Sequence, residues 1–532
     1  MAAENVGAIT VVGSASGGHT GILEPDSDDL GASFVPATPF TPGEQVTVTT
    51  SLPIAGGHDG SYRFTVSTPV AHSAGPAAPG PSDPQQVETF HSAPALQVPK
   101  LTVSQSSATE AAGDLFTAPY RGAGQNGPMI TDTSGNLVWF DPLPNGLEAF
   151  DFRTQTYAGQ PVLTWWQGYV TATGQGYGED EIYDDTYQPV ATVTAGNGYQ
   201  SDLHEFQLTA SGTALVTAYQ PVQWDTSSMG GSANGVVIDA IMQEIDVATG
   251  NVLFEWHSLD HVALTASYAG LSAQYDYFHI NSIDEDAAGN LLISSRGTHT
   301  IYQIDRTTGE IVWQLGGKDS DFAGTGTTFN SQHNAKWLTP TTLTIFDNGT
   351  GVGKDSEPQS HGLVVALDLS AHTATLVQAY SSPSVPQASS QGNVQTLVGG
   401  NVLVGWGAQP FVSEFTPDGT LIFQAGLPSS DQNYRAYLLA WSGHPAAAPA
   451  VAATAADGGT TVYASWNGAT GVAAWQVLAG ASADALATVN TAPRAGFETQ
   501  IDAATNAPYV AVRALDRAGN VLATSAAVRV GV

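Results

Sequence analysis

The sequence predicts an all-β protein with a six-bladed β-propeller, flanked by an N-terminal β-sandwich and a C-terminal fibronectin type III-like β-sandwich. Three observations carry this prediction. Charged residues make up 12% of the chain, about half the usual share, while 58 Gly and 30 Pro separate short runs rich in Val, Thr, Ile and aromatic residues. A turn-and-strand unit recurs through the middle of the chain. At both ends, apolar and polar residues alternate with period two.

The recurring unit is a turn with a glycine followed by a strand with an aromatic residue four positions later. It reads DTSGNLVWF, VATGNVLFEW, RTTGEIVWQ and TPDGTLIFQ, with the pairs Gly135 and Trp139, Gly250 and Phe254, Gly309 and Trp313, and Gly419 and Phe423. Gly250 and Gly309 are one repeat length apart, whereas the gaps from Gly135 to Gly250 and from Gly309 to Gly419 are about two repeat lengths. Each of the two longer gaps is therefore expected to hold one degenerate unit. Six units predict six four-stranded blades whose outermost strands carry the aromatic residues. The segment YRAYLLAWSG is expected to close the ring beside the first blade.

Changes in composition divide the chain into four parts. Residues 1–72 alternate in strand fashion and predict the N-terminal β-sandwich. Residues 73–105 are rich in Pro and Ala, and we expect a linker, or an extended arm lying on its neighbour. The propeller is assigned to residues 106–445, and the fibronectin type III-like sandwich to residues 446–532.

Charge and composition exclude several classes of function. With 14 Lys and Arg against 48 Asp and Glu, the net charge of -34 repels nucleic acid and anionic membrane surfaces. The chain has no Cys, which excludes disulfides and zinc-thiolate sites, and no apolar run long enough to insert into a membrane. We expect a secreted or extracytoplasmic protein that starts at Met1 after removal of an export signal.

Three histidines occur at corresponding positions, each at the start of the innermost strand of a blade. They are His204 in DLHEFQL, His279 in YFHINSIDE and His333 in SQHNAKWL. Innermost strands surround the central channel of a propeller, so equivalent residues on successive blades converge at one mouth. The sequence therefore predicts a pocket with three imidazoles. We assign structural roles to the other histidines His257, His261, His299 and His361.

Arg296 and Asn281 are predicted to complete this pocket. A short hairpin returns Arg296, in GNLLISSRGTHTI, to the side of His279, and Asn281 is expected on the same strand face as His279. A guanidinium, an amide and imidazoles together suit a tetrahedral oxyanion such as sulfate.

These residues resemble the arylsulfotransferase family. The resemblance rests on HxN followed by a D..GN.L.S.R strand, on TTGEIVWQLGG, and on QH followed by FDNG at 346–349, and it covers most of 106–445. It implies a six-bladed propeller and a two-step, ping-pong transfer of a sulfuryl group from an aryl sulfate to a phenol, without the nucleotide cofactor PAPS. In this family pattern, His333 matches the histidine that becomes sulfated. The resemblance assigns binding of the sulfuryl oxygens and help in proton transfer to His204, His279, Asn281 and Arg296.

Several alternatives remain open from the sequence. Three histidines also suit zinc, although an arginine beside them argues against a metal. The chain also fits a secreted, non-catalytic propeller that binds an anion, or a different reaction in the same pocket. The acidic run at 179–185 predicts a solvated turn rather than a calcium loop. Trp165, Trp166 and Tyr177 lie in a segment expected to cover the channel mouth.

Overall fold

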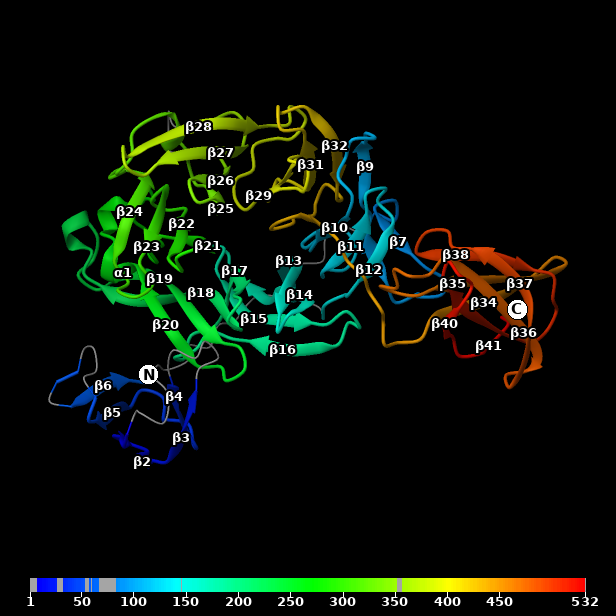
Figure 1. Cartoon of the computed structure of the whole chain (residues 1–532), viewed down its shortest axis with the longest axis horizontal. Helices are drawn as coiled ribbons and strands as arrows, with labels where there is room; N and C mark the ends of the chain where they lie inside the picture. Colours follow the sequence, from blue (N-terminus) through cyan, green and yellow to red (C-terminus); the bar gives the residue numbers. More distant parts are fainter. Residues whose placement is uncertain are drawn as a thin grey trace.

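The computed structural model describes residues 7–25, 32–52, 57–58, 60–66, 83–144, 146–351 and 356–531. The fold is all-β and propeller-like. Figure 1 shows six sheets placed around a common centre, with the strands β13, β17, β21, β25 and β29 nearest to it. Among the described residues, no helix is long and apolar enough to cross a membrane.

Five of the six sheets contain four antiparallel strands, and the sixth has a fifth strand, from the arm before the ring, at its outer edge. From the centre outward the strands follow sequence order, except that the first sheet takes its inner strand from the far end of the chain. The first three sheets are β33 (Tyr437–Leu439), β10 (Asp114–Thr117), β11 (Met129–Asp132) and β12 (Leu137–Phe140); β13 (Glu148–Tyr157), β14 (Gln160–Val170), β15 (Gly176–Tyr183) and β16 (Pro189–Val193); and β17 (Asp202–Leu208), β18 (Thr213–Trp224), β19 (Gly235–Asp246) and β20 (Val252–His257). The other three are β21 (Ile280–Glu285), β22 (Leu291–Ser295), β23 (Thr300–Ile304) and β24 (Ile311–Gly316); β25 (His333–Thr339), β26 (Thr342–Asp347), β27 (His361–Asp368) and β28 (Thr373–Tyr380); and β29 (Asn393–Thr396), β30 (Val402–Gly405), β31 (Phe411–Phe415) and β32 (Leu421–Gly426). The short helices α1 (Ser258–His261), η2 (Ser227–Met229), η3 (Leu264–Ala266) and η4 (Thr325–Thr327) lie in loops.

The recurring aromatic residues lie on the outer strands, as the sequence predicts. Trp139, Phe254, Trp313 and Phe423 belong to β12, β20, β24 and β32, and the glycine before each has a positive φ. The two longer gaps contain the second and fifth sheets. Neighbouring sheets pack through apolar side chains, for example Met242 and Trp256 against Ile293 and Tyr302, which are all fully buried.

The ring of sheets closes through the C-terminal strand β33, which pairs with β10 in the register Leu115 to Leu438. The closing segment is the one expected from the sequence. Of the predicted linker, residues 73–82 lie outside the described residues. Residues 83–105 form the hairpin β7 (Val87–Thr89) and β8 (Gln97–Pro99), and the strand β9 (Thr102–Gln105), which pairs with the outer edge of β32. This part of the segment is an arm lying on its neighbour.

Two sheets form each end of the described chain, and Figure 1 shows the two ends on opposite sides of the ring. The N-terminal sheets are β2 (Gly17–His19), β1 (Ile9–Gly13), β5 (Gln45–Thr50) and β6 (Ser61–Thr65), and the pair β3 (Gly21–Pro25) and β4 (Ala32–Pro36). The C-terminal sheets are β34 (Ala450–Ala456), β35 (Gly459–Ser465) and β38 (Glu498–Ala503), and β37 (Ala485–Pro493), β36 (Ala474–Ser482), β39 (Tyr509–Leu515), β40 (Val521–Thr524) and β41 (Val528–Arg529).

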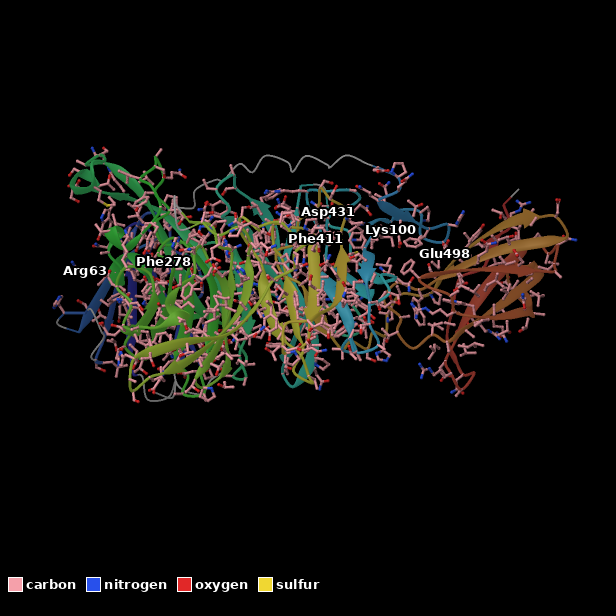
Figure 2. The ribbon with its side chains drawn as sticks, turned by 90° about the horizontal axis from the view of Figure 1, so that it is seen from above. Arg63, Lys100, Phe278, Phe411, Asp431 and Glu498 are labelled. Carbon is pink, nitrogen blue, oxygen red and sulfur yellow. The ribbon has the colours of Figure 1, made fainter. Side chains whose placement is uncertain are left out.

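Hydrogen bonds attach the C-terminal sheets to the ring. The Asn467 amide exchanges two hydrogen bonds with the backbone of Phe140, at 2.8 and 3.0 Å. The Glu498 carboxylate accepts hydrogen bonds from the backbone N–H groups of His91 and Ser92, at 3.1 and 2.6 Å. Figure 2 shows Glu498 on the side of these sheets that faces Lys100.

Candidate functional site

The three predicted histidines meet at one cavity of about 300 Å³ at the end of the ring where the inner strands begin. His204 is the third residue of β17, His279 precedes β21, and His333 is the first residue of β25. Arg296, in the turn between β22 and β23, lines the same cavity. The cavity lies at the small end of ligand pockets, which are commonly about 300 to 1,000 Å³. It has room for a single-ring substrate.

The hydrogen bonds of His333 determine which ring nitrogen carries its proton. Nδ1 lies 2.7 Å from the Asn348 Oδ1 atom and 3.1 Å from the Ser331 carbonyl oxygen. The Asn348 amide nitrogen donates to the Ala388 and Gln391 carbonyl oxygens, so its oxygen faces the histidine. Because both partners of Nδ1 are acceptors, Nδ1 is the protonated nitrogen. Nε2 therefore keeps its lone pair, and the Gln391 N–H donates to it at 3.2 Å.

Burial keeps the His333 imidazole neutral. Only 1% of the residue is exposed, and burial, followed by the positive charge of Arg296, places its pKa well below the usual value. Neutral imidazole is the nucleophilic form, and the Nε2 lone pair of His333 can attack a substrate in place of accepting the Gln391 N–H. Burial also lowers the pKa of His204, although Asp202 opposes this effect.

His204 and His279 form a second pair of imidazoles, with ring centroids 4.8 Å apart and planes at 81°. The Asp202 carboxylate contacts Nδ1 of His204, and the Asp276 carboxylate contacts Nδ1 of His279 at 2.6 Å. Burial raises the pKa of Asp276, but His279 and Gln175 together more than offset burial, and the net pKa is lowered. Asp276 is therefore an ionised carboxylate that orients the His279 ring through Nδ1.

Arg296 supplies a cation beside these rings. Its backbone N–H donates to the His279 carbonyl oxygen at 3.0 Å, which confirms the predicted hairpin. Its Nη2 lies 3.4 Å from the Ser389 carbonyl oxygen, and its buried Nε has no hydrogen-bond partner among the described residues. Burial lowers the pKa of the guanidinium, which stays charged because an arginine pKa starts above about 12. An unpaired donor on a buried cation favours binding of an anion.

Asn281 does not line the cavity. The predicted position assumed an extended strand through His279, but His279 has a φ of 55°, and the register of β21 against β22 shifts between Ile280 and Ser282. Asn281 is the extra residue of this bulge. Its amide nitrogen donates to the Gln332 carbonyl oxygen at 2.7 Å, and the residue is fully buried.

The mouth of the cavity is lined by the loop 170–174 between β14 and β15, which belongs to the segment expected there. The aromatic residues named in that segment do not line the cavity. Trp165 and Trp166 are 1% exposed within the second sheet, and Trp166 donates to the Ser201 carbonyl oxygen at 3.0 Å. Tyr177 does not line the cavity. The acidic run also differs from its prediction, because Asp180 is fully buried in β15 rather than solvated.

Further lining residues come from loops where the sequence gives no repeat to follow. Arg121 lies between β10 and β11, Gln391 precedes β29, and Gln432 precedes β33. Tyr120 and Tyr434 add aromatic walls. Of these residues, only Arg121 has a signal in the sequence, because it is one of just 14 Lys and Arg in a very acidic chain.

A buried ionic cluster lies next to His204, and the sequence reasoning also missed it. Arg435 contacts Asp151 at 3.0 Å and Glu205 at 3.2 Å, and it donates to the His204 carbonyl oxygen at 3.0 Å. Arg153 and Lys336 contact Glu205 at 2.8 and 2.9 Å. Burial raises the pKa of Glu205, but Arg435 and Lys336 outweigh burial and hold it well below its usual value.

A cluster of potential metal-ligating side chains lies outside the cavity. Among the described residues, Asp347, Glu357 and His361 place their ligand atoms within 4.8 Å of one another. The three cavity histidines form no such group, and their Nδ1 atoms face Asp202, Asp276 and Asn348. The other histidines that were assigned structural roles, His257, His261, His299 and His361, do not line the cavity.

Comparisons with solved structures return distant similarities. A protein of unknown function from Bacteroides caccae is 13% identical, with a TM-score of 0.38 over 61% of this chain and 98% of that chain. Virginiamycin B lyase from Staphylococcus aureus is 11% identical, with a TM-score of 0.30 over 61% of this chain and 87% of that chain. No curated protein matches the sequence.

The family comparison covers the part of the chain that carries the three cavity histidines and Arg296. The pattern of the family described as arylsulfotransferase (ASST) matches residues 153–427, which are more than half of the chain. The matched range includes His204, His279, Arg296 and His333. The chain therefore belongs to the arylsulfotransferase (ASST) family.

Proposed function

We propose that the protein transfers a sulfuryl group from an aryl sulfate to a phenolic acceptor through a sulfated His333, without a nucleotide cofactor. The observation that carries this proposal is the unprotonated Nε2 of His333, which lines a cavity together with the cation of Arg296. In this proposal, the six sheets are the blades of a propeller, and the sheets at both ends are spacers. We also propose that the protein works outside the cytoplasm, on the strength of its composition.

In the first step, the Nε2 lone pair of His333 attacks the sulfur atom of the donor. The bond from sulfur to the aryl oxygen breaks, and its electron pair leaves on that oxygen, which takes a proton from His279. Asp276 supports this role because its carboxylate orients the His279 ring through Nδ1. Arg296 offers donors to the sulfuryl oxygens, where negative charge is concentrated during transfer.

In the second step, the acceptor phenol gives its proton to the now neutral His279, and its oxygen attacks the sulfur atom. The bond between sulfur and Nε2 breaks, and the electron pair returns to His333. Splitting the transfer in two allows donor and acceptor to use the same cavity in turn. This order suits a cavity with space for one aromatic ring.

The test is incubation with 4-nitrophenyl sulfate, with and without phenol, while nitrophenol release and intact mass are followed. We expect acceptor-dependent release and a sulfuryl mass gain on the peptide that contains His333. His333→Ala should abolish both signals. The control is His444→Ala, which alters an exposed histidine that does not line the cavity and should keep both signals. An active His333→Ala protein would reject the nucleophile. Sulfate binding without turnover in the wild type would support a non-catalytic anion-binding protein instead.

A further inference from the structure

We infer that Arg121 forms a second anion subsite, so that the preferred substrates are single-ring phenols or aryl sulfates with an additional carboxylate or other anionic group. This inference rests on the proposed function, since it names the substrates of the same cavity. Arg296 and Arg121 both line the cavity and come from different sheets, the fourth and the first. In the proposed reaction, Arg296 faces the sulfuryl group. Arg121 then has no substrate anion to bind if the sulfuryl group is the only anionic group of the substrate.

The structure holds Arg121 in a fixed direction. Its Nε donates to the Glu148 Oε1 atom at 2.9 Å and its Nη2 to Oε2 at 3.5 Å. Glu148 is 2% exposed, whereas 43% of the Arg121 side chain is exposed. Among the described residues, the Arg121 Nη1 atom has no hydrogen-bond partner. One edge of the guanidinium is therefore anchored, and a further edge is available for a carboxylate.

The backbone at Arg121 supports a role beyond the ion pair. Arg121 has a φ of 63°, a conformation that costs energy for a residue with a side chain. Gly122 follows directly, and a Cβ atom there would lie 1.0 Å from the Asp431 Oδ1 atom, so the loop is tightly packed. A strained arginine in a packed loop directed at a cavity is typical of a binding position.

Arg121 is one of few cations in a strongly acidic chain. The chain has 14 Lys and Arg against 48 Asp and Glu, so the general field repels anionic substrates. Arg121, Arg296 and the nearby Arg153, Lys336 and Arg435 account for five of the 14 cations. Of these five cations, Arg121 and Arg296 line the cavity, and their charge lowers the cost of bringing an anion into it. Burial raises the pKa of Glu148, and the hydrogen bond and charge of Arg121 oppose this effect.

The test compares two acceptors that differ in charge and little in shape, 4-hydroxybenzoate and 4-hydroxybenzamide, with 4-nitrophenyl sulfate as donor. The readout is the ratio of their kcat/KM values. We expect the wild type to prefer the carboxylate, and Arg121→Gln to reduce the ratio roughly tenfold, the value of one charge-assisted hydrogen bond at a partly exposed site. The same kcat/KM ratio measured with 3-hydroxybenzoate and 3-hydroxybenzamide tests a carboxylate in the meta position.

Two variants control for folding and for net charge. Arg121→Gln/Glu148→Gln leaves no unpaired buried carboxylate and should lose the preference to the same extent. Lys100→Gln removes a cation from an exposed position and should keep the ratio of the wild type. An unchanged ratio in both Arg121 variants would overturn the inference and leave Arg121 as a structural partner of Glu148.

The inference and the proposed function fail in different ways. If the wild type releases no nitrophenol, the proposed function fails, and calorimetric binding of the two acceptors then tests the subsite by itself. Tighter binding of 4-hydroxybenzoate that depends on Arg121 would support the subsite without the reaction. Equal binding of both acceptors would overturn it.

Discussion

Asn348 determines the chemical state of the proposed nucleophile. Its amide oxygen accepts the Nδ1 proton of His333 at 2.7 Å, and its amide nitrogen is held by the Ala388 and Gln391 carbonyl oxygens. An amide orients the ring without adding charge, so burial and the positive charge of Arg296 keep the pKa of His333 low and the imidazole neutral. A carboxylate at the same place would favour the protonated form.

This difference predicts the pH dependence of an Asn348→Asp variant. In the wild type, the pKa of His333 lies well below its usual value, so protonation of the nucleophile does not slow nitrophenol release between about pH 8 and pH 6. The new carboxylate stabilises the imidazolium and raises this pKa, so the rate should fall as the pH falls through that range. The measurement is kcat/KM for 4-nitrophenyl sulfate against pH. Parallel profiles in both proteins would contradict this account of Asn348.

The sequence was sufficient to predict the residues of the cavity that follow the repeat. His204, His279 and His333 share one place in successive units, and Arg296 is fixed by a short hairpin. Asn281 was placed wrongly because the rule of alternating side chains requires extended backbone, and His279 has a positive φ. The positive φ of His279 depends on packing in the folded ring, and the spacing of residues in the sequence gives no information about that packing.

At the scale of elements, two units of the ring lack the turn glycine of the recurring motif. Tyr187 and His372 stand in the turns before β16 and β28, with φ values of 61° and 50° where other units have glycine. The Tyr187 hydroxyl donates to the Gly468 carbonyl oxygen at 2.8 Å and accepts from Trp441 at 2.9 Å. A contact with the C-terminal sheets thus replaces the glycine, and this contact is invisible in the sequence.

The turn glycines themselves allow a prediction about stability. Gly135 and Gly250 have φ values of 88° and 73°, so an alanine at either position costs about 1 to 2 kcal/mol in backbone strain. A Cβ at Gly135 would also lie 2.8 Å from the Leu101 carbonyl oxygen, whereas no atom lies within 4 Å of one at Gly250. Gly135→Ala should therefore lower the Tm more than Gly250→Ala. Equal losses in thermal unfolding would show that the Leu101 segment moves freely.

At the scale of the molecule, the ionic cluster joins five of the six sheets around the centre. Glu205 belongs to β17 of the third sheet, Asp151 to β13 of the second and Lys336 to β25 of the fifth. Arg435, two residues before β33 of the first sheet, also donates to the Asn281 carbonyl oxygen of the fourth at 2.9 Å. Three cations, with Arg153, and two carboxylates lie here, which leaves positive charge close to the proposed anion site.

Arg435→Met tests whether this cluster holds the ring together. The side chain is fully buried, and its removal leaves Asp151 and Glu205 with fewer partners, while two carbonyl oxygens keep only the Tyr434 hydroxyl as donor. We expect the free energy of unfolding in urea, followed by tryptophan fluorescence, to fall by about 3 to 5 kcal/mol. The exposed Arg529 provides the control, since Arg529→Met should change stability by less than about 0.5 kcal/mol. If both variants unfold at the same urea concentration, apolar packing between neighbouring sheets closes the ring, and the cluster acts only on the charge of the cavity.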